Sequence, residues 1–133
     1  MWLVSDSSPK IELSATVRYL GVAIGVIAGV ALALAGDVAF RRAQTTINPF
    51  KPQNTSSLVT SGVYRITRNP MYLGMLVLLL GWSIFLGSPL ALLGLAAFVA
   101  YITRFQIIPE ERVLLGKFGA AYADYVARVR RWI

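Results

Sequence analysis

The sequence predicts an all-α, polytopic membrane protein, and two observations carry that prediction. Of its 133 residues, 56% are hydrophobic and only 14% are charged, whereas soluble domains average about 25% charged residues. Two long stretches, residues 19–36 and 71–103, contain no charged side chain. The length allows one domain, residues 1–133. Lipid is therefore the expected surrounding of much of the chain.

The first apolar stretch predicts a transmembrane helix over about residues 19–40. Gly21, Gly25 and Gly29 recur along it at four-residue spacing, and Ala33 continues the series. Small residues on one face let the backbones of two membrane helices approach closely. We expect this glycine stripe to pack against another helix of the chain, and the alternative is association with a separate partner.

The second apolar stretch predicts a transmembrane helical hairpin. As one helix it would be about 50 Å long, well beyond the roughly 30 Å of a hydrocarbon core. Gly87, Ser88 and Pro89 lie near its middle, where proline ends a helix and glycine permits a turn. The expected arms cover about residues 70–86 and 89–108.

The basic residues predict the orientation in the membrane. Eleven of the 13 lysines and arginines lie between the first span and the hairpin or after the hairpin. The positive-inside rule places the loop of residues 41–69 and the tail of residues 109–133 in the cytoplasm. The net charge of +7 then fits anionic lipid headgroups and requires no nucleic acid. We expect a multi-pass protein of a plasma or inner membrane.

The tail is predicted to be helical and amphipathic. Pro109 suits the first position of a new helix, and Glu110 and Glu111 suit its first turn. Apolar residues then recur at helical spacing, while Gly116 and Gly119 predict a kink or two short helices. Such a tail would lie along the membrane interface or against the cytoplasmic loop.

Two polar clusters flank the hairpin, over residues 58–74 and 104–112. Because a hairpin brings its two ends together, we expect Arg68 of the first cluster to lie near Glu110 and Glu111 of the second. The chain has no histidine or cysteine, which excludes a disulfide framework, zinc sites built on those side chains, and a Cys or His nucleophile. No metal site is predicted. The alternative is an Arg–Glu network that only holds the fold together.

The motifs in these clusters resemble those of integral-membrane methyltransferases related to isoprenylcysteine carboxyl methyltransferase and phospholipid methyltransferase. The matching pieces, in order, are Gly62-Val63-Tyr64, the run from Arg68 to Gly74, Glu110-Glu111, Phe118-Gly119, Tyr122, Tyr125 and the run from Val129 to Trp132. The resemblance implies that S-adenosylmethionine binds in a cytosolic pocket and that a lipophilic acceptor enters from the membrane.

Carried over position by position, the resemblance implies a set of site residues. The cofactor would contact Leu58, Val59, Tyr64, Arg68, Asn69, Pro70, Met71 and Glu110. Arg68-Asn69-Pro70 stands where the family has Arg-His-Pro. Gln106 stands where the family has an acceptor-side arginine, and Arg104 lies two residues earlier, so both are predicted to bind the acceptor.

Elementary chemistry agrees with this assignment. The sulfonium cation of the cofactor can be attracted by Glu110 and met by the ring of Tyr64 or Tyr72 in a cation–π contact. Arg68, a predicted catalytic residue, can give the methionine carboxylate a bidentate pair of hydrogen bonds. A carboxylate or thiolate acceptor is already nucleophilic, whereas an amine must lose a proton, for which Glu111 is the predicted base.

Other functions stay open from the sequence. The acceptor could be a phospholipid amine or a thiol, and a non-catalytic membrane protein could associate through Gly21, Gly25 and Gly29. Membrane reductases share a similar hairpin and tail, but no glycine fingerprint for a nicotinamide cofactor is evident here. Residues 1–4, followed by Pro9, look like the end of a further helix, with which small members of the family usually begin.

Overall fold

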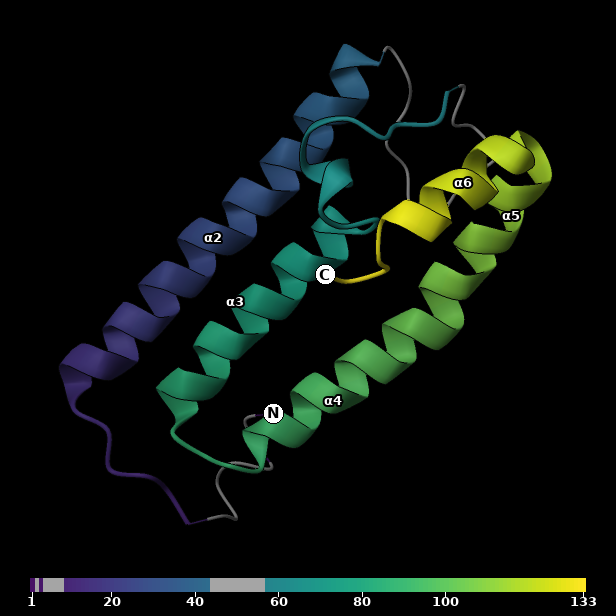
Figure 1. Ribbon diagram of the computed structural model, residues 1–133. Coiled ribbons are helices and arrows are strands. Elements are labelled where there is room, and N and C mark those ends of the chain that lie inside the picture. The colour runs from purple at the N-terminus through teal and green to yellow at the C-terminus, as the bar shows by residue number, and fades with distance from the viewer. Residues whose placement is uncertain (2, 4–8, 44–56) are drawn as a thin grey trace.

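Every regular element in the part of the chain that the structure describes is a helix. The computed structural model describes residues 1, 3, 9–43 and 57–133 (Figure 1). The elements are α2 (Ala15–Arg42), the 3-10 helix η2 (Gly62–Arg65), α3 (Pro70–Leu86), α4 (Ala91–Ile102), the π-helix η3 (Thr103–Ile107), α5 (Ile108–Phe118) and α6 (Ala120–Arg128). These residues form no strand, which confirms the predicted all-α class.

Within the described residues, two stretches are long and apolar enough to cross a membrane: α2, and the continuous helix Ala91–Phe118 that α4, η3 and α5 form together. The apolar helix α3 is shorter, with 17 residues. The start of α2 lies at Ala15 rather than near residue 19, because the Ser14 side chain caps the helix by accepting a hydrogen bond from the backbone N–H of Val17.

Glycines form the seam between α2 and α3. A Cβ atom added at Gly29 would lie 2.7 Å from the carbonyl oxygen of Gly74, and one added at Gly81 would lie 2.7 Å from that of Gly21. A Cβ atom at Gly25 would lie 3.0 Å from the Gly81 Cα. The glycine stripe therefore packs against the hairpin, as predicted. The alternative prediction was that a separate protein binds this glycine face. That face is already covered by α3 of the same chain.

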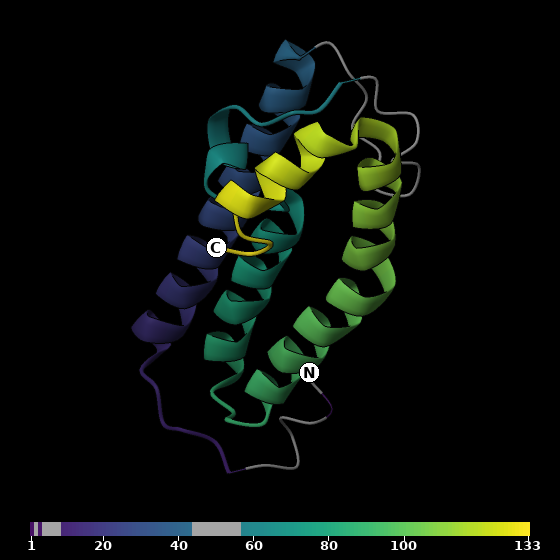
Figure 2. The same cartoon turned by 45° about the vertical axis from the view of Figure 1, so that its right-hand side comes forward.

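The hairpin turn lies where the sequence predicted it. Gly87 follows α3 with a φ of 61°, the left-handed conformation that glycine adopts easily at a helix C-terminus. Because residues 88–90 complete the turn, α4 begins at Ala91 rather than at Pro89. From this turn, α3 and the Ala91–Phe118 helix diverge, as both views show (Figure 1, Figure 2).

The second arm is longer than predicted. Pro109 does lie in the first turn of α5, but α5 continues η3 without a break, so residues 109–118 extend the arm instead of starting a separate tail. Proline removes one hydrogen bond of a helix and crowds the carbonyl four residues before it. The wider turn of η3, in which the backbone N–H of Ile108 bonds to the Thr103 carbonyl, precedes Pro109 and accommodates it. The 28 residues span about 42 Å, more than a hydrocarbon core.

The chain reverses at Gly119 and not at Gly116, which lies inside α5. Gly119 has a φ of 54°, so α6 folds back across the diverging ends of the helices (Figure 2). The buried side chains of α6 belong to one hydrophobic cluster: Ala39, Val59, Tyr64, Tyr122, Tyr125 and Val129. This cluster joins α2, η2 and α6 at the end of the molecule opposite the hairpin turn, which we call the open end (residues 36–43, 57–72 and 106–133).

The open end also carries most of the described lysine and arginine residues. The end of α2, the start of α3, α5 and α6 all lie there, opposite the turn at residues 87–90 (Figure 1). This grouping is what the charge pattern predicted, and the cytoplasmic side of the open end stays a prediction. Residues 44–56 of the predicted loop, Lys51 among them, lie outside the described residues.

Candidate functional site

A polar layer joins the two arms of the hairpin at the open end. The Tyr72 hydroxyl on α3 donates a hydrogen bond to Glu110 Oε1 on α5, at 2.6 Å. The side-chain amide of Gln106 on η3 donates to the same oxygen, at 2.8 Å. Tyr72 is buried and Glu110 is half-buried, so this carboxylate is fixed in position inside the molecule.

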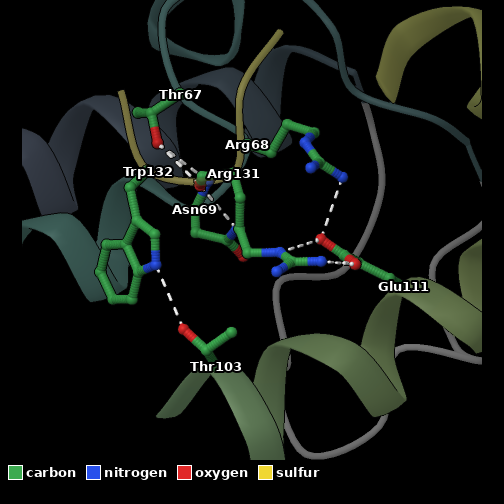
Figure 3. A network of polar contacts seen from close by, with 7 residues as sticks. All are labelled: Thr67, Arg68, Asn69, Thr103, Glu111, Arg131 and Trp132. Atoms are coloured by element: carbon green, nitrogen blue, oxygen red, sulfur yellow. Dashed lines mark hydrogen bonds and ion pairs between the residues drawn. The ribbon is translucent and has the colours of Figure 1, made fainter. Parts of the chain in front are cut away.

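A second carboxylate, Glu111, is held by two arginines. Arg68 Nη1 donates to Glu111 Oε1 at 2.9 Å, and Arg131 donates to both carboxylate oxygens, at 2.9 and 2.8 Å (Figure 3). Only 9% of the Arg68 side chain is exposed. Its Nε atom is buried and has no hydrogen-bond partner among the described residues. A buried donor of this kind is costly unless an acceptor group meets it.

Residues 129–133, which we call the C-terminal strap, run beside the start of α3. The Arg131 carbonyl accepts hydrogen bonds from Asn69 Nδ2, at 2.9 Å, and from the Thr67 hydroxyl, at 3.5 Å. The backbone N–H of Arg68 donates to the Arg130 carbonyl at 3.1 Å. Asn69 is the N-cap residue of α3, but its side chain makes no capping hydrogen bond and bonds to the strap instead.

Buried tyrosines form the aromatic wall of the open end. The Tyr125 hydroxyl donates to the Tyr64 carbonyl at 2.7 Å, and the rings of Phe40 and Tyr64 lie 5.4 Å apart. Burial raises the pKa of Tyr64, Tyr122 and Tyr125 above the ordinary value for a phenol. These rings are therefore neutral at physiological pH and present uncharged faces to the site.

Many of these groups line one cavity. Its lining includes ten of the twelve predicted site residues: Leu58, Val59, Tyr64, Arg68, Asn69, Pro70, Met71, Tyr72, Glu110 and Glu111. The predicted juxtaposition of the two polar clusters is thus confirmed by the geometry. The roles assigned to these residues stay predictions.

The two predicted acceptor-binding residues lie apart from each other. Gln106 contacts Glu110, beside the cavity. Arg104 lines a separate hollow between α3 and α4, whose other lining residues are Leu76, Leu95, Ala96, Val99, Ala100, Thr103 and Ile108. Arg104 is exposed and has no hydrogen-bond or ion-pair partner among the described residues.

Six lining residues were not predicted as site residues: Phe40, Ser57, Ile107, Leu114, Tyr122 and Tyr125. Tyr122 and Tyr125 carried a signal, because both belong to the helical repeat of the tail and to the quoted motif. Arg131, which is outside the cavity lining, belongs to the quoted motif but not to the helical repeat, and it was not predicted as a site residue either. Phe40 lies at the end of an apolar span and had no local signal at all.

The cavity suits a flat or flexible ligand that carries both a cation and a carboxylate. Glu110 and the tyrosine rings can attract a cation, the rings by cation–π contact. The unpartnered Nε of Arg68 can donate to a carboxylate, which an arginine fork recognises well. A predominantly apolar wall with a few convergent polar groups is typical of small-molecule sites.

Comparison with known families points the same way. The phospholipid methyltransferase family model matches residues 16–121. The chain is 32% identical to a probable protein-S-isoprenylcysteine O-methyltransferase of Oryza sativa subsp. indica, over 91% of this chain and 63% of that protein. It is 31% identical to protein-S-isoprenylcysteine O-methyltransferase B of Arabidopsis thaliana, over 78% of this chain and 53% of that protein.

A shorter relative matches more strongly. An uncharacterised protein of Haemophilus influenzae is 48% identical over 47% of this chain and over its own whole length. The chain spans between half and two thirds of the two plant relatives. No solved structure matches it significantly.

Proposed function

Because the chain belongs to the phospholipid methyltransferase family, we propose that it transfers a methyl group from S-adenosylmethionine to a lipophilic or small acceptor at the cytoplasmic face of a membrane. One observation carries the proposal: Arg68, with its unpartnered Nε, and Glu110 line the same aromatic-walled cavity. We favour a carboxylate acceptor of the isoprenylcysteine kind, which the names of the plant relatives mention.

The residues present fit the proposed cofactor. When bound, S-adenosylmethionine supplies an electrophilic methyl group on a sulfonium sulfur. Arg68 would bind its carboxylate, while Glu110 and the rings of Tyr64 and Tyr72 would face the sulfonium charge. The remaining wall, which would contact the apolar and adenine parts, is formed by Leu58, Val59, Asn69, Pro70 and Met71.

The contacts of Glu111 favour a positioning role over the predicted role of base. Both of its oxygens already accept hydrogen bonds from Arg68 or Arg131. A carboxylate acceptor needs no base, so transfer to it depends mainly on the alignment of the acceptor with the methyl group. Glu111 would then hold the Arg68 guanidinium at the angle that the cofactor carboxylate requires.

The hollow between α3 and α4 is the proposed approach for the acceptor. Ala96 and Ala100 are one helical turn apart, and their small side chains leave room for an apolar chain. Arg104 lines the same hollow and can attract an anionic group at the end of that chain. Ile107 lines the cavity and Ile108 lines the hollow, so one stretch of the Ala91–Phe118 helix contributes to both spaces.

Binding of S-adenosylmethionine to the purified protein in detergent tests the proposal. We expect saturable binding by the wild type and about tenfold weaker binding by Glu110→Gln, which keeps the shape but loses roughly 1.4 kcal/mol of charge attraction. Asp124→Asn is the matched control, because Asp124 is exposed on α6, and it should bind like the wild type. Folded wild-type protein that does not bind the cofactor would overturn the proposal.

A phospholipid amine is the second candidate acceptor, because the description of the matched family names phospholipids. The positive charge of Arg104 discriminates between the two, since it attracts a carboxylate and repels an ammonium group. We expect Arg104→Gln to lower methyl transfer to a prenylated cysteine several-fold, as for loss of a single exposed charge contact of about 1 kcal/mol. Unchanged or faster transfer to phosphatidylethanolamine vesicles, with none to the prenylated cysteine in either protein, would favour the amine.

A further inference from the structure

The C-terminal strap bonds to both sides of the gap between the hairpin arms. On one side, its Arg130 and Arg131 carbonyls accept hydrogen bonds from residues 67–69 at the start of α3. On the other side, the Arg131 guanidinium bonds to Glu111, and the indole N–H of Trp132 donates to the Thr103 hydroxyl at 3.2 Å (Figure 3). The strap therefore ties the start of α3 to the Ala91–Phe118 helix.

The part of that helix to which the strap is tied is also its weakest part. Thr103–Ile107 is a π-helix, in which the Ile108 N–H reaches back to the Thr103 carbonyl. Pro109 follows and supplies no N–H. Helices bend most readily at prolines and at π-turns, so η3 is the natural hinge of the arm.

The two contacts of the strap with this arm lie on either side of the hinge. Thr103 is the first residue of η3, and Glu111 lies in the first turn of α5 beyond it. A segment fixed at both points opposes bending between them. Its other end is anchored on α3, which packs tightly against α2 through the glycine seam.

We propose that the strap braces this hinge, with Arg131 and Trp132 as positioning residues that fix the separation between α5 and the start of α3. Arg131 acts through Glu111, which also orients Arg68, and Trp132 acts through Thr103. The separation sets the width of the cavity, which both elements line. The consequence for methyl transfer rests on the proposed function, whereas the brace itself does not.

The distance between α2 and α5 can be measured directly between two spin labels. Because the chain has no cysteine of its own, two introduced cysteines carry the only labels. Val38→Cys on α2 and Leu115→Cys on α5 place the labels at exposed positions beside the open end. We expect one narrow distance in this labelled protein. Trp132→Phe, which keeps the ring but removes the N–H, should lengthen or broaden it by about 2–5 Å, the scale of helix shifts in switching proteins.

Paired variants separate bracing from general damage. Thr103→Val should act like Trp132→Phe, and the double variant should add nothing, since both remove the same hydrogen bond. Thr103→Ser keeps the hydroxyl and should restore the narrow distance. Trp82→Phe, at a half-exposed tryptophan of α3, is the control and should leave the distance unchanged.

The results distinguish the brace from the proposed function, because the distance is measured without cofactor and S-adenosylmethionine is titrated separately. An unchanged distance in both Trp132→Phe and Thr103→Val would overturn the brace, whether or not the cofactor binds. An equal shift in Trp82→Phe or Thr103→Ser would overturn it as well. A shift confined to the predicted variants, in protein that never binds the cofactor, would support the brace and contradict the methyltransferase proposal.

Discussion

Replacing Arg68 with alanine is expected to weaken S-adenosylmethionine binding by about 30- to 150-fold, or roughly 2–3 kcal/mol, the usual loss for charge-assisted hydrogen bonds. The Arg68 side chain is 9% exposed and lines the cavity, and its Nε has no partner within the described residues. Removal of the guanidinium takes away both the donor and the positive charge that would meet the cofactor carboxylate. Isothermal titration in detergent measures the change.

Two further variants sharpen this result. Arg68→Lys keeps the charge but loses the planar fork, so we expect binding between that of the wild type and that of the alanine variant. Arg65→Ala removes an exposed arginine three residues away and should change binding less than about twofold. Glu111 retains Arg131 in every case, so the protein should stay folded. Near-wild-type binding by folded Arg68→Ala would show that the carboxylate lies elsewhere.

Replacing Gly29 with alanine is expected to destabilise the protein by about 1–3 kcal/mol, the usual cost of overpacking. The new methyl group would lie 2.7 Å from the Gly74 carbonyl oxygen, which belongs to a helix backbone and cannot move alone. The two helices must therefore separate along part of their seam. Thermal unfolding in detergent measures the loss.

Gly116→Ala is the matched control, because no heavy atom lies within 4 Å of a Cβ atom added there. Alanine is the better helix former by about 1 kcal/mol, so this variant should be as stable as the wild type or more so. The Gly29→Ala effect should not depend on protein concentration, since the seam lies within one chain. A loss that vanishes on dilution would indicate instead that the stripe joins two molecules.

The main elements of the site could be predicted because each depends on local chemistry. Charge-free runs mark the apolar helices, and a glycine and a proline mark the turn between them. Once the hairpin is drawn, Arg68 before its first arm and Glu110 after its second must share one end. The observed contacts of Arg68 with Glu111, and of Tyr72 with Glu110, follow from that topology.

The course of the second arm could not be predicted, because a proline is compatible with two different structures at this position. Pro109 fits the start of a helix, but it also fits a continuing helix when a wider turn precedes it, and nothing local decides between them. Arg104 and Gln106 were grouped for their place in the motif. Residues two apart point about 200° apart around a helix, so one lies beside the cavity and the other lines the hollow.

The C-terminal strap was predicted wrongly: the apolar repeat of the tail predicted a helix through these residues, but α6 ends at Arg128 and residues 129–133 form neither helix nor strand. Its partners lie 20 to 64 residues away along the chain. Such pairings depend on how the helices are already arranged, and no local pattern specifies them. Arg131 was consequently seen as part of a motif without its partner, Glu111.

The position of the strap also sets an order of assembly during synthesis. The ribosome delivers α2, α3 and the Ala91–Phe118 helix before residues 120–133, so these helices can enter the bilayer and pack while the cavity still lacks Tyr122 and Tyr125. Membrane helices generally insert first and associate afterwards. A nascent chain halted before Arg131 would thus have its helices in place, but Glu111, which contacts Arg68, would still lack its hydrogen bonds from Arg131. The ability to retain a ligand would be acquired only after the helices are in place.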